Sequence, residues 1–422
     1  MRLKRTMLLI FVFFSFFSPF SSVLIASSSY FYQSLEAASD LPESYIIQDV
    51  PWVGQPARYC CSFGCLAMLI NYYGVNTTIE EVLHSSGIGY SFAYIRFLTT
   101  RNPMAGAGVC QFPLNTLSTL SLYGLKTDPK SYLDPYIKGS NAISDENWEN
   151  YWSNVKGHIA EDAPILTSVD PFSIPYYREK LNITNTETHG GHAIIVIGYN
   201  ESNQTVCYND PGPGIWDEEE NGSYVFISKQ LFRDAVENTT GSRYIVGLIT
   251  DDPNNEALSK EERFNISHKR NIQRMKGFIG AYAGFNFPIK FPYLGINGLK
   301  IFKRDFQPGL THRVIMVNAF SKMEKIQVEH FFIFMKLEKQ DISRFLLENE
   351  ELSPVCRQNG LLLKKESECW KNLTDLALQL NEISQNNNLL KSLSLTSHIT
   401  KEMSIILGEI IDIHEEIISI SN

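Results

Sequence analysis

The chain has 422 residues, of which 44% are hydrophobic and 20% are charged, a composition typical of folded globular proteins. This length is enough for two domains, each with its own hydrophobic core. The formal net charge of −9 gives no electrostatic support for nucleic-acid binding, so we expect no nucleic-acid partner.

The N-terminus has the pattern of a secretory signal. Three basic residues among the first five precede an apolar run over residues 7–17, and small residues around Ser28 offer a cleavage position. Counted as far as Ala26, the apolar stretch is also about long enough to span a bilayer. The sequence therefore predicts a signal peptide or signal anchor over residues 1–28. We expect a secreted or membrane-anchored protein whose domains lie outside the cytoplasm and which contacts the membrane only through this segment, if it is uncleaved.

The remaining chain divides by its patterns. A polar linker over residues 29–43 leads into a stretch, 44–252, that mixes helical periods with short β-rich runs. Residues 277–298 are crowded with Gly, Phe and Pro and favour irregular structure, and the pattern from Leu299 onward is helical. One stripe of an amphipathic helix is formed by Ile406, Ile410, Ile413 and Ile417. We predict an α+β domain over 44–252, followed by a mainly α-helical domain over 253–422.

The first candidate for chemistry is a thiol at a helix start. A β-rich approach leads through a loop to an apolar helix that begins near Ser62 and is closed by Gly74. At the helix N-terminus, the positive end of the macrodipole lowers the pKa of the Cys61 thiol and favours the thiolate. Gln55, six residues upstream, is placed to donate its side-chain amide to an oxyanion. The alternative is that these cysteines are small residues packing a core helix.

The second candidate is a hairpin that carries a histidine and an aspartate. A run of β-branched residues ending at Tyr199 follows Gly-Gly-His192, and a second strand runs from Thr205 to Asp210. Pairing Tyr199 with Thr205 places Ile194 opposite Asp210. His192 and Asp210 then become diagonal neighbours on one face, about 7–8 Å apart at the backbone, within reach of a carboxylate–imidazole hydrogen bond. A core histidine and a turn aspartate would explain each residue separately, but not their joint placement.

These segments together resemble a known family. The order Gln55, Cys61 at a helix start, Gly-Gly-His192 on a strand and Asn-Asp210-Pro-Gly is similar to the family-39 cysteine peptidases, which include domains that trim double-glycine leader peptides. The resemblance covers roughly residues 46–235. It implies a papain-like cysteine proteinase fold, in which a nucleophile helix packs on an antiparallel sheet. It also implies that Cys61 is the nucleophile, His192 the base, Asp210 its orienter and Gln55 the oxyanion donor.

The spacing distinguishes Cys61 from its neighbour Cys60. Cys61 lies six residues after Gln55 and thirteen before Gly74, as the resembled pattern requires, whereas Cys60 misses both by one. Cys61 also shares one helix face with Cys65, four residues on. We therefore predict Cys61 as the nucleophile. Cys60 is left as a loop thiol, for which Cys110 and Cys207 are the candidate partners.

A second resemblance leaves the reaction open. The segment from Cys65 to Gly74 and the following residues 84–96 are similar to the N-terminal domain of the butirosin-biosynthesis acyltransferase family. Residues 295–306 are similar to the start of that family's helical domain. This resemblance implies transfer of an acyl group from a carrier thioester to an amine. Three functions remain: an exported hydrolase of peptide or amide bonds, an acyltransferase using the same thiol, and a catalytically inactive binding module. A carrier-bound donor is normally cytosolic, so the signal pattern favours hydrolysis.

The cysteine pattern bears on cofactors and cross-links. The chain has seven cysteines, none in a Cys-x-x-Cys pair or in a Cys/His cluster with zinc spacing, so we expect no metal and no cofactor. Cys356 and Cys369 are the only cysteines outside the first domain, and export favours oxidation. We predict a disulfide between them.

Overall fold

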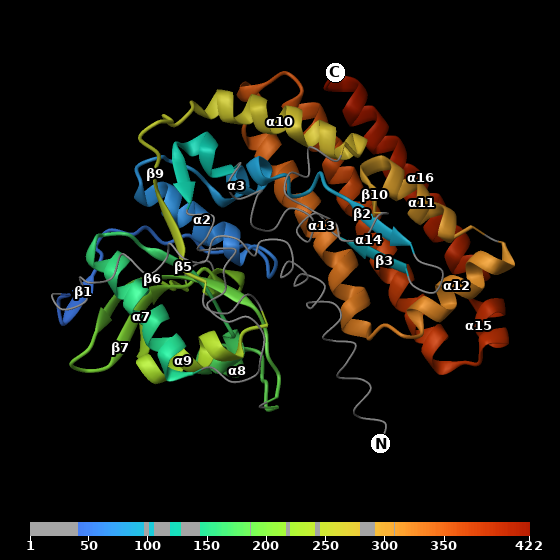
Figure 1. The fold of residues 1–422 in the computed structure, drawn as a ribbon. Helices are drawn as coiled ribbons and strands as arrows, with labels where there is room; N and C mark the ends of the chain where they lie inside the picture. The colour runs from blue at the N-terminus through green and yellow to red at the C-terminus, as the bar shows by residue number, and fades with distance from the viewer. Residues whose placement is uncertain are drawn as a thin grey trace, which may run out of the picture. The chain divides into compact units, whose positions relative to one another are not determined.

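A computed structural model describes residues 41–96, 101–104, 119–127, 144–185, 187–216, 220–240, 245–278, 292–307 and 309–422 (Figure 1). The fold is mixed α+β, with an antiparallel sheet in the first part of the chain and a helical C-terminal region, as predicted. The predicted signal segment, the linker up to residue 40 and Cys110 lie outside the described residues. No helix of the described ranges is both long and apolar enough to cross a membrane.

The chain forms two compact units. The first comprises Met1–Ile79 and Gly124–Glu256, and the second comprises Glu80–Tyr123 and Ala257–Asn422. The boundary predicted at residue 252 lies close to the junction between Glu256 and Ala257. Residues 80–123, which the prediction places in the first domain, group instead with the C-terminal helices.

A seven-stranded sheet is the centre of the first unit. Its strands follow the order β4-β9-β5-β6-β7-β8, and β1 pairs with β6 outside this path. Each of these pairings is antiparallel. The strand bounds are β1 Ser44–Ile46, β4 Leu125–Thr127, β5 Ile165–Val169, β6 His192–Asn200, β7 Thr205–Asn209, β8 Val225–Ser228 and β9 Gly247–Asp251. The β-branched run predicted as a strand is β6, and it is fully buried from Ile194 to Ile197 because it lies inside the sheet.

Four α-helices and two 3-10 turns accompany this sheet. Their bounds are α2 Cys61–Tyr72, α7 Asp145–Ala160, η2 Pro171–Ser173, α8 Pro175–Lys180, η3 Gly212–Ile215 and α9 Lys229–Asn238. The Ser144 hydroxyl caps α7 by accepting from the Asn147 amide. The helix α2 ends close to where the sequence predicts: Gly74 has φ of +84°, a left-handed conformation that glycine adopts without a steric penalty.

The second unit is mainly helical. Its elements are α3 Ile79–Ser86, β2 Ala93–Arg96, β3 Arg101–Met104, η1 Ser121–Tyr123, α10 Lys260–Lys276, β10 Pro292–Leu294, α11 Gly295–Asp305, α12 Leu310–Phe320, α13 Lys325–Glu348, η5 Glu350–Leu352, α14 Cys356–Asn386, α15 Leu389–Leu395 and α16 Ser397–Ile420. Helix α14 packs against both α13 and α16 (Figure 1). The predicted stripe lies on α16, where Ile410, Ile413 and Ile417 are buried.

Residues 80–123 belong to this unit because their buried side chains find their partners there. The Glu81 carboxylate accepts from Arg263 Nε at 2.7 Å, and both side chains are about 95% buried. The His84 ring stacks on Phe264 of α10 at a centroid distance of 5.0 Å and also contacts Phe345 of α13. A buried ion pair and stacked rings therefore anchor α3 to helices that lie far downstream in the chain.

The disulfide predicted between Cys356 and Cys369 is wrong. Both cysteines are free, and both lie on the single helix α14. At a rise of 1.5 Å per residue they are about 20 Å apart along the helix axis, whereas a disulfide needs its Cα atoms within about 7 Å. Cys207 is also free.

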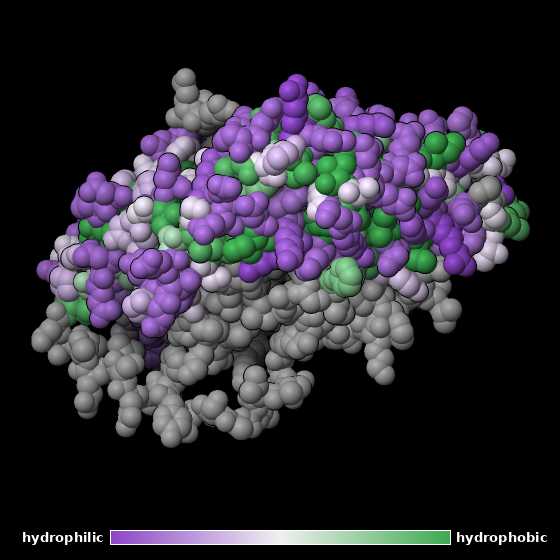
Figure 2. Space-filling view, turned by 90° about the horizontal axis from the view of Figure 1, so that it is seen from above, coloured by the Kyte–Doolittle hydropathy of each residue, from purple (hydrophilic) through white to green (hydrophobic). Residues whose placement is uncertain are grey.

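The surface of the described residues is predominantly polar. Hydrophilic residues make up most of the coloured part of Figure 2, with smaller hydrophobic patches between them. This is the ordinary surface of a globular protein, since polar groups do not cover all of it.

Candidate active site

Cys61 is the first residue of α2. Cys60 precedes it as the N-terminal cap residue, and the backbone amides of Phe63 and Gly64 both donate to the Cys60 carbonyl at 2.9 Å. Cys60 is fully buried, whereas Cys61 remains partly exposed. The thiol of Cys61 thus lies in the first helical turn, where the unsatisfied amides give a positive potential.

The hairpin of β6 and β7 brings His192 and Asp210 to one end of the sheet. His192 begins β6, and Asp210 directly follows β7. The predicted pairing of Tyr199 with Thr205 is wrong by one residue, because Tyr199 pairs with Val206. A β-bulge between Val196 and Gly198 then shifts the register back, so that Ile195 pairs with Asn209. The predicted register therefore holds at the end that carries the two side chains.

Cys61, His192 and Asp210 lie together in one cluster. His192 Nε2 lies 2.7 Å from Asp210 Oδ1, with 8% and 4% of the two side chains exposed. The Cys61 thiol interacts with the His192 ring, and this interaction lowers the pKa of the thiol. Since Nε2 faces the carboxylate, we assign Nδ1 as the ring nitrogen that meets the thiol. The Gly212 amide also donates to Asp210 Oδ1 at 2.8 Å, and the Trp52 indole donates to the Asp210 carbonyl at 2.7 Å.

The charges and hydrogen bonds around Cys61 and His192 favour a thiolate–imidazolium pair. Burial alone would raise the pKa of Cys61, but the hydrogen bond with His192 and the charge of its ring lower it below the ordinary value. Burial alone would lower the pKa of His192, but the Asp210 carboxylate, aided by Cys61, raises it to about 10. By contrast, burial raises the pKa of Cys65 well above its ordinary value. Of these two thiols, Cys61 is therefore the one whose pKa is lowered.

Gln55 lies beside this cluster in a fixed position. Its side chain is 1% exposed and its Nε2 donates to the Ala57 carbonyl at 2.8 Å, while its backbone amide donates to the Pro211 carbonyl at 2.8 Å. Among the described residues, Oε1 has no hydrogen-bond partner. The second hydrogen on Nε2 remains for another acceptor, but the oxyanion role of Gln55 stays a prediction.

A close packing contact joins α2 to the segment after β7. A Cβ atom added to Gly64 would lie 2.8 Å from Pro211 Cβ, so a larger side chain would push α2 away from the Asp-Pro-Gly turn. This contact, together with the hydrogen bond from Gln55 to Pro211, fixes the position of Cys61 relative to Asp210. The glycine in the first turn of α2 thus positions the site.

Tyr177 is a residue of this cluster that the sequence analysis did not identify. It lies on α8, and its hydroxyl is 2.8 Å from both oxygens of Asp210 and 3.0 Å from His192 Nε2. Nothing in a six-residue helix between two loops marks one tyrosine as part of the site, because only the folded chain places it over the hairpin.

Asp170 supports the strand that carries His192. Its carboxylate is fully buried and accepts from four donors: the amides of Phe172 and Gly190, the Ser173 hydroxyl and His189 Nδ1, at 3.1, 2.8, 2.9 and 3.0 Å. The Gly190 carbonyl in turn accepts from the Thr240 amide. Because His192 follows Gly190 by two residues, Asp170 fixes the backbone that leads into His192.

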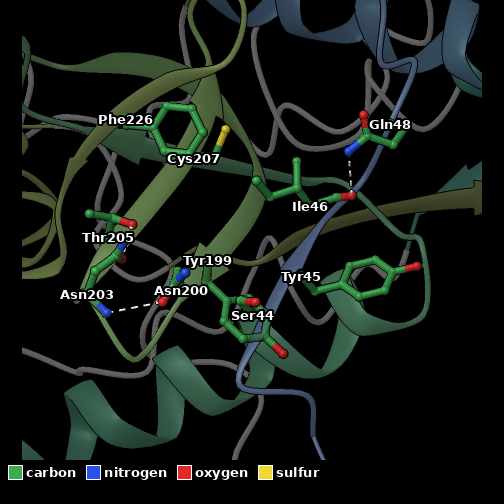
Figure 3. Close-up of a pocket in the computed structure, with 10 residues that line it drawn as sticks. All are labelled: Ser44, Tyr45, Ile46, Gln48, Tyr199, Asn200, Asn203, Thr205, Cys207 and Phe226. Atoms are coloured by element: carbon green, nitrogen blue, oxygen red, sulfur yellow. Dashed lines mark hydrogen bonds between the residues drawn. The ribbon is translucent and has the colours of Figure 1, made fainter.

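A separate pocket of about 420 Å³ lies over β1, β6, β7 and β8 (Figure 3). In Figure 3, the Cys207 sulfur and the Phe226 ring lie together along its wall. Ile46 pairs with Gly198, Gly198 with Cys207, and Cys207 with Phe226, so the four form one row across the sheet. None of the residues lining the pocket belongs to the Cys61 cluster.

The described residues contain no group of three or more His, Cys, Asp or Glu side chains that could hold a metal ion. The Cys61 cluster itself offers a thiol, an imidazole and a carboxylate.

Comparison with known proteins connects this geometry to a family. Residues 47–242 match the family model described as "Peptidase_C39 like family". None of the curated proteins that were compared with the chain matches it.

Proposed function

We propose, from the membership of residues 47–242 in the peptidase C39-like family, that this protein is an exported cysteine-dependent hydrolase of peptide or amide bonds. The family makes a cysteine-peptidase-like function the starting point. Cys61 is the nucleophile, His192 the base, Asp210 the orienter of that base and Gln55 the oxyanion donor. Export rests on the signal pattern of residues 1–28.

One observation carries the proposal: His192 is hydrogen-bonded to the buried carboxylate of Asp210 and interacts with the thiol of Cys61 at the start of α2, whose pKa it lowers. A nucleophile, its base and an orienting acid thus follow one another in the order that thiol hydrolysis needs. The lowered pKa of Cys61 and the raised pKa of His192 favour a thiolate that needs no proton removal before it attacks.

The steps follow from the positions of these groups. The Cys61 thiolate attacks the carbonyl carbon, and the oxygen takes the negative charge, towards which the free Nε2 hydrogen of Gln55 can turn. The His192 imidazolium gives its proton to the departing amine, leaving an acyl group on Cys61. Neutral His192 then takes a proton from water, whose oxygen attacks the thioester. The acyl group leaves as the carboxylic acid, and the thiolate and the imidazolium are restored. Asp210 keeps the ring oriented throughout.

A pair of single substitutions tests the proposal on the full-length protein. With a fluorogenic mixture of peptide amides, Cys61→Ala should reduce turnover by roughly 10³-fold or more, as removal of a nucleophile does. It should also abolish labelling by an iodoacetamide probe at this position. Cys60→Ala is the matched control, since it removes a neighbouring thiol and should leave most of the turnover intact.

The outcome also separates the proposal from its alternatives. Product release in water, with no amine acceptor added, supports hydrolysis, whereas turnover that requires an added amine supports acyl transfer. A Cys61 thiol that neither reacts with the probe nor supports turnover supports an inactive binding module. Turnover that is lost in Cys60→Ala and kept in Cys61→Ala would overturn the assignment of the nucleophile.

A further inference from the structure

We infer that Tyr177 is a positioning residue, whose hydroxyl holds the Asp210 carboxylate in the orientation that supports His192. The inference rests on the proposed function, because it concerns the base of that reaction. Tyr177 does not touch the reacting thiol in this role. It acts through the carboxylate.

The contacts of the hydroxyl define what it does. Its oxygen is 2.8 Å from both Asp210 Oδ1 and Oδ2, and 3.0 Å from His192 Nε2. Burial, with the charge of Asp210, raises the pKa of Tyr177 well above its ordinary value, so the group is a neutral donor. Its single proton goes to the carboxylate, and its lone pairs face the Nε2 proton. The hydroxyl thus links both members of the pair.

The two carboxylate oxygens do not have equal support. Asp210 Oδ1 accepts from His192 Nε2 and from the Gly212 amide as well as from Tyr177. For Oδ2, the hydroxyl of Tyr177 is the one hydrogen-bond donor that the described residues provide. Because Asp210 is 3% exposed, water is not freely available to replace that donor.

The surroundings hold the Tyr177 ring over this oxygen. The ring is 4% exposed and packs against Trp216 at a centroid distance of 5.7 Å and against Tyr176 at 5.2 Å. On its other side it meets the His192 ring edge-on at 5.3 Å. A Cβ atom added to Gly212 would lie 1.8 Å from the Tyr177 hydroxyl, so the glycine at this position leaves the space that the hydroxyl occupies.

Loss of the hydroxyl has a definite consequence. Without it, Oδ2 is a buried charged oxygen with no hydrogen-bond donor among the described residues. The carboxyl group then becomes more stable if it rotates or takes up a proton. Either change weakens the attraction between Asp210 and His192, so the imidazolium is less stable. The Cys61 thiolate then loses part of its partner's charge, and the thiol deprotonates only at higher pH.

The test measures the alkylation of Cys61 by iodoacetamide across a pH series, in full-length protein, with the modified residue located by tandem mass spectrometry. In Tyr177→Phe, we expect the midpoint of the Cys61 alkylation curve to move up by about one pH unit, the shift expected when one hydrogen bond to the charged network is lost. Tyr176→Phe, which removes the same atom from the adjacent ring of α8, should leave the midpoint unchanged. Circular dichroism at each pH confirms that both variants stay folded, so a shift of the midpoint reports the site and not a loss of structure.

A second variant reaches the same hydroxyl by another route. Gly212→Ala keeps the backbone amide that donates to Oδ1 but displaces the Tyr177 hydroxyl, and its Cβ would also lie 3.0 Å from Asp210 Oδ1, so it should produce an upward shift of the midpoint as well. In the double variant the shift should be no larger than in either single variant. The inference is overturned if both single variants keep the wild-type midpoint. If the wild-type Cys61 itself shows an ordinary thiol midpoint, the proposed function fails instead, and the two failures are therefore distinguishable.

Discussion

Three cysteines within one turn and a half of chain differ because of what surrounds each thiol. Cys60 and Cys65 are fully buried, and Cys65 is held protonated by that burial. Cys61 is partly exposed, starts the helix and meets His192. The helix start could be predicted from the sequence because the loop-to-helix transition and the closing glycine are local signals. The hydrogen bonds of Cys61 depend on the folded sheet.

The gap in the sequence reasoning at this scale is Tyr177. His192 and Asp210 lie on one hairpin, so strand periodicity relates them, but α8 reaches the pair through tertiary packing alone. A side chain that completes a site from a separate short helix leaves no spacing rule to detect.

The thiolate–imidazolium pair predicts a specific pH dependence for turnover of a peptide amide. The rate should rise as the pH increases through the lowered pKa of Cys61, below the ordinary thiol range, because the thiolate forms there. It should fall as the pH increases through about 10, where His192 loses its proton. The raised pKa of His192 also stabilises the fold: this contribution is complete below the unfolded value near 6.5 and is lost as the pH rises through about 10.

The control for this profile is Asp210→Asn, which removes the charge that does most to raise the pKa of His192. Its alkaline limb should move to lower pH. Turnover would be measured from pH 4 to 11 in buffers of constant ionic strength. A wild-type alkaline limb near the ordinary histidine value would contradict the pairing of His192 with Asp210.

At the scale of elements, the β6–β7 hairpin shows why an ideal register can be wrong at one end and right at the other. Alternation of side chains specifies which face a strand buries, but not whether an extra residue is accommodated within it. Here the bulge between Val196 and Gly198 absorbs the one-residue error made at the turn. The relation of His192 to Asp210 is therefore preserved.

Helix length explains the wrong disulfide. Polar residues between Cys356 and Cys369 fit a loop as well as the exposed face of a long helix, and only the helix α14 keeps the two thiols apart. Packing against α13 and α16 stabilises the helix over a loop here, and the local sequence pattern contains no information on that long-range packing.

Gly198 provides an element-scale prediction. A Cβ atom at this position would lie 2.8 Å from both Ile46 Cγ1 and the Tyr45 carbonyl, so Gly198→Ala must push β1 from β6. We expect this substitution to lower the free energy of unfolding by about 1–3 kcal/mol, as overpacking of a close contact does. Urea unfolding followed by tryptophan fluorescence measures it.

Gly157→Ala is the matched control. This glycine lies in α7, and an added Cβ would meet no atom within 4 Å. The same change should therefore raise the stability by about 0.5–1 kcal/mol, because alanine is the better helix former. If Gly198→Ala is as stable as the wild type, the close approach of β1 to β6 is not present in solution.

For the whole molecule, the sequence predicts a first domain and a helical second one, but it does not predict that the second is discontinuous. The described parts of residues 80–123 contain a helix and short strands, which fit an α+β domain equally well. Their assignment depends on partners such as Arg263 and Phe264, which follow long after them in the chain. Sequence patterns predict the secondary structure of each segment, whereas only the tertiary contacts assign the segment to one of the two units.

Truncation tests this organisation. A fragment of residues 1–256 keeps α3 without the helices on which it packs, so Val82 and Leu83, fully buried in the full chain, lose their cover. We expect this fragment to aggregate, because exposed apolar surface of this kind drives association. Gel filtration and circular dichroism measure the result.

The matched fragment replaces residues 80–123 by a flexible glycine–serine linker. It removes residues 80–123, which lose their packing partners in the 1–256 fragment, and keeps the sheet of the first unit. It should therefore be soluble and retain β structure. If instead the simple 1–256 fragment is monomeric and folded, residues 80–123 do not need the C-terminal helices.

The discontinuity also sets an order of events on the ribosome. Glu81 emerges 182 residues before its partner Arg263, and Glu80 emerges 264 residues before Arg344. At roughly 5–20 residues per second, the first of these intervals alone lasts about 10–35 s. During that time the sheet that carries His192 and Asp210 can form, while the apolar side chains of α3 remain exposed to solvent. Helix α3 is therefore prone to aggregation until the last third of the protein has been made. During this interval a chaperone that binds short apolar helices would bind α3.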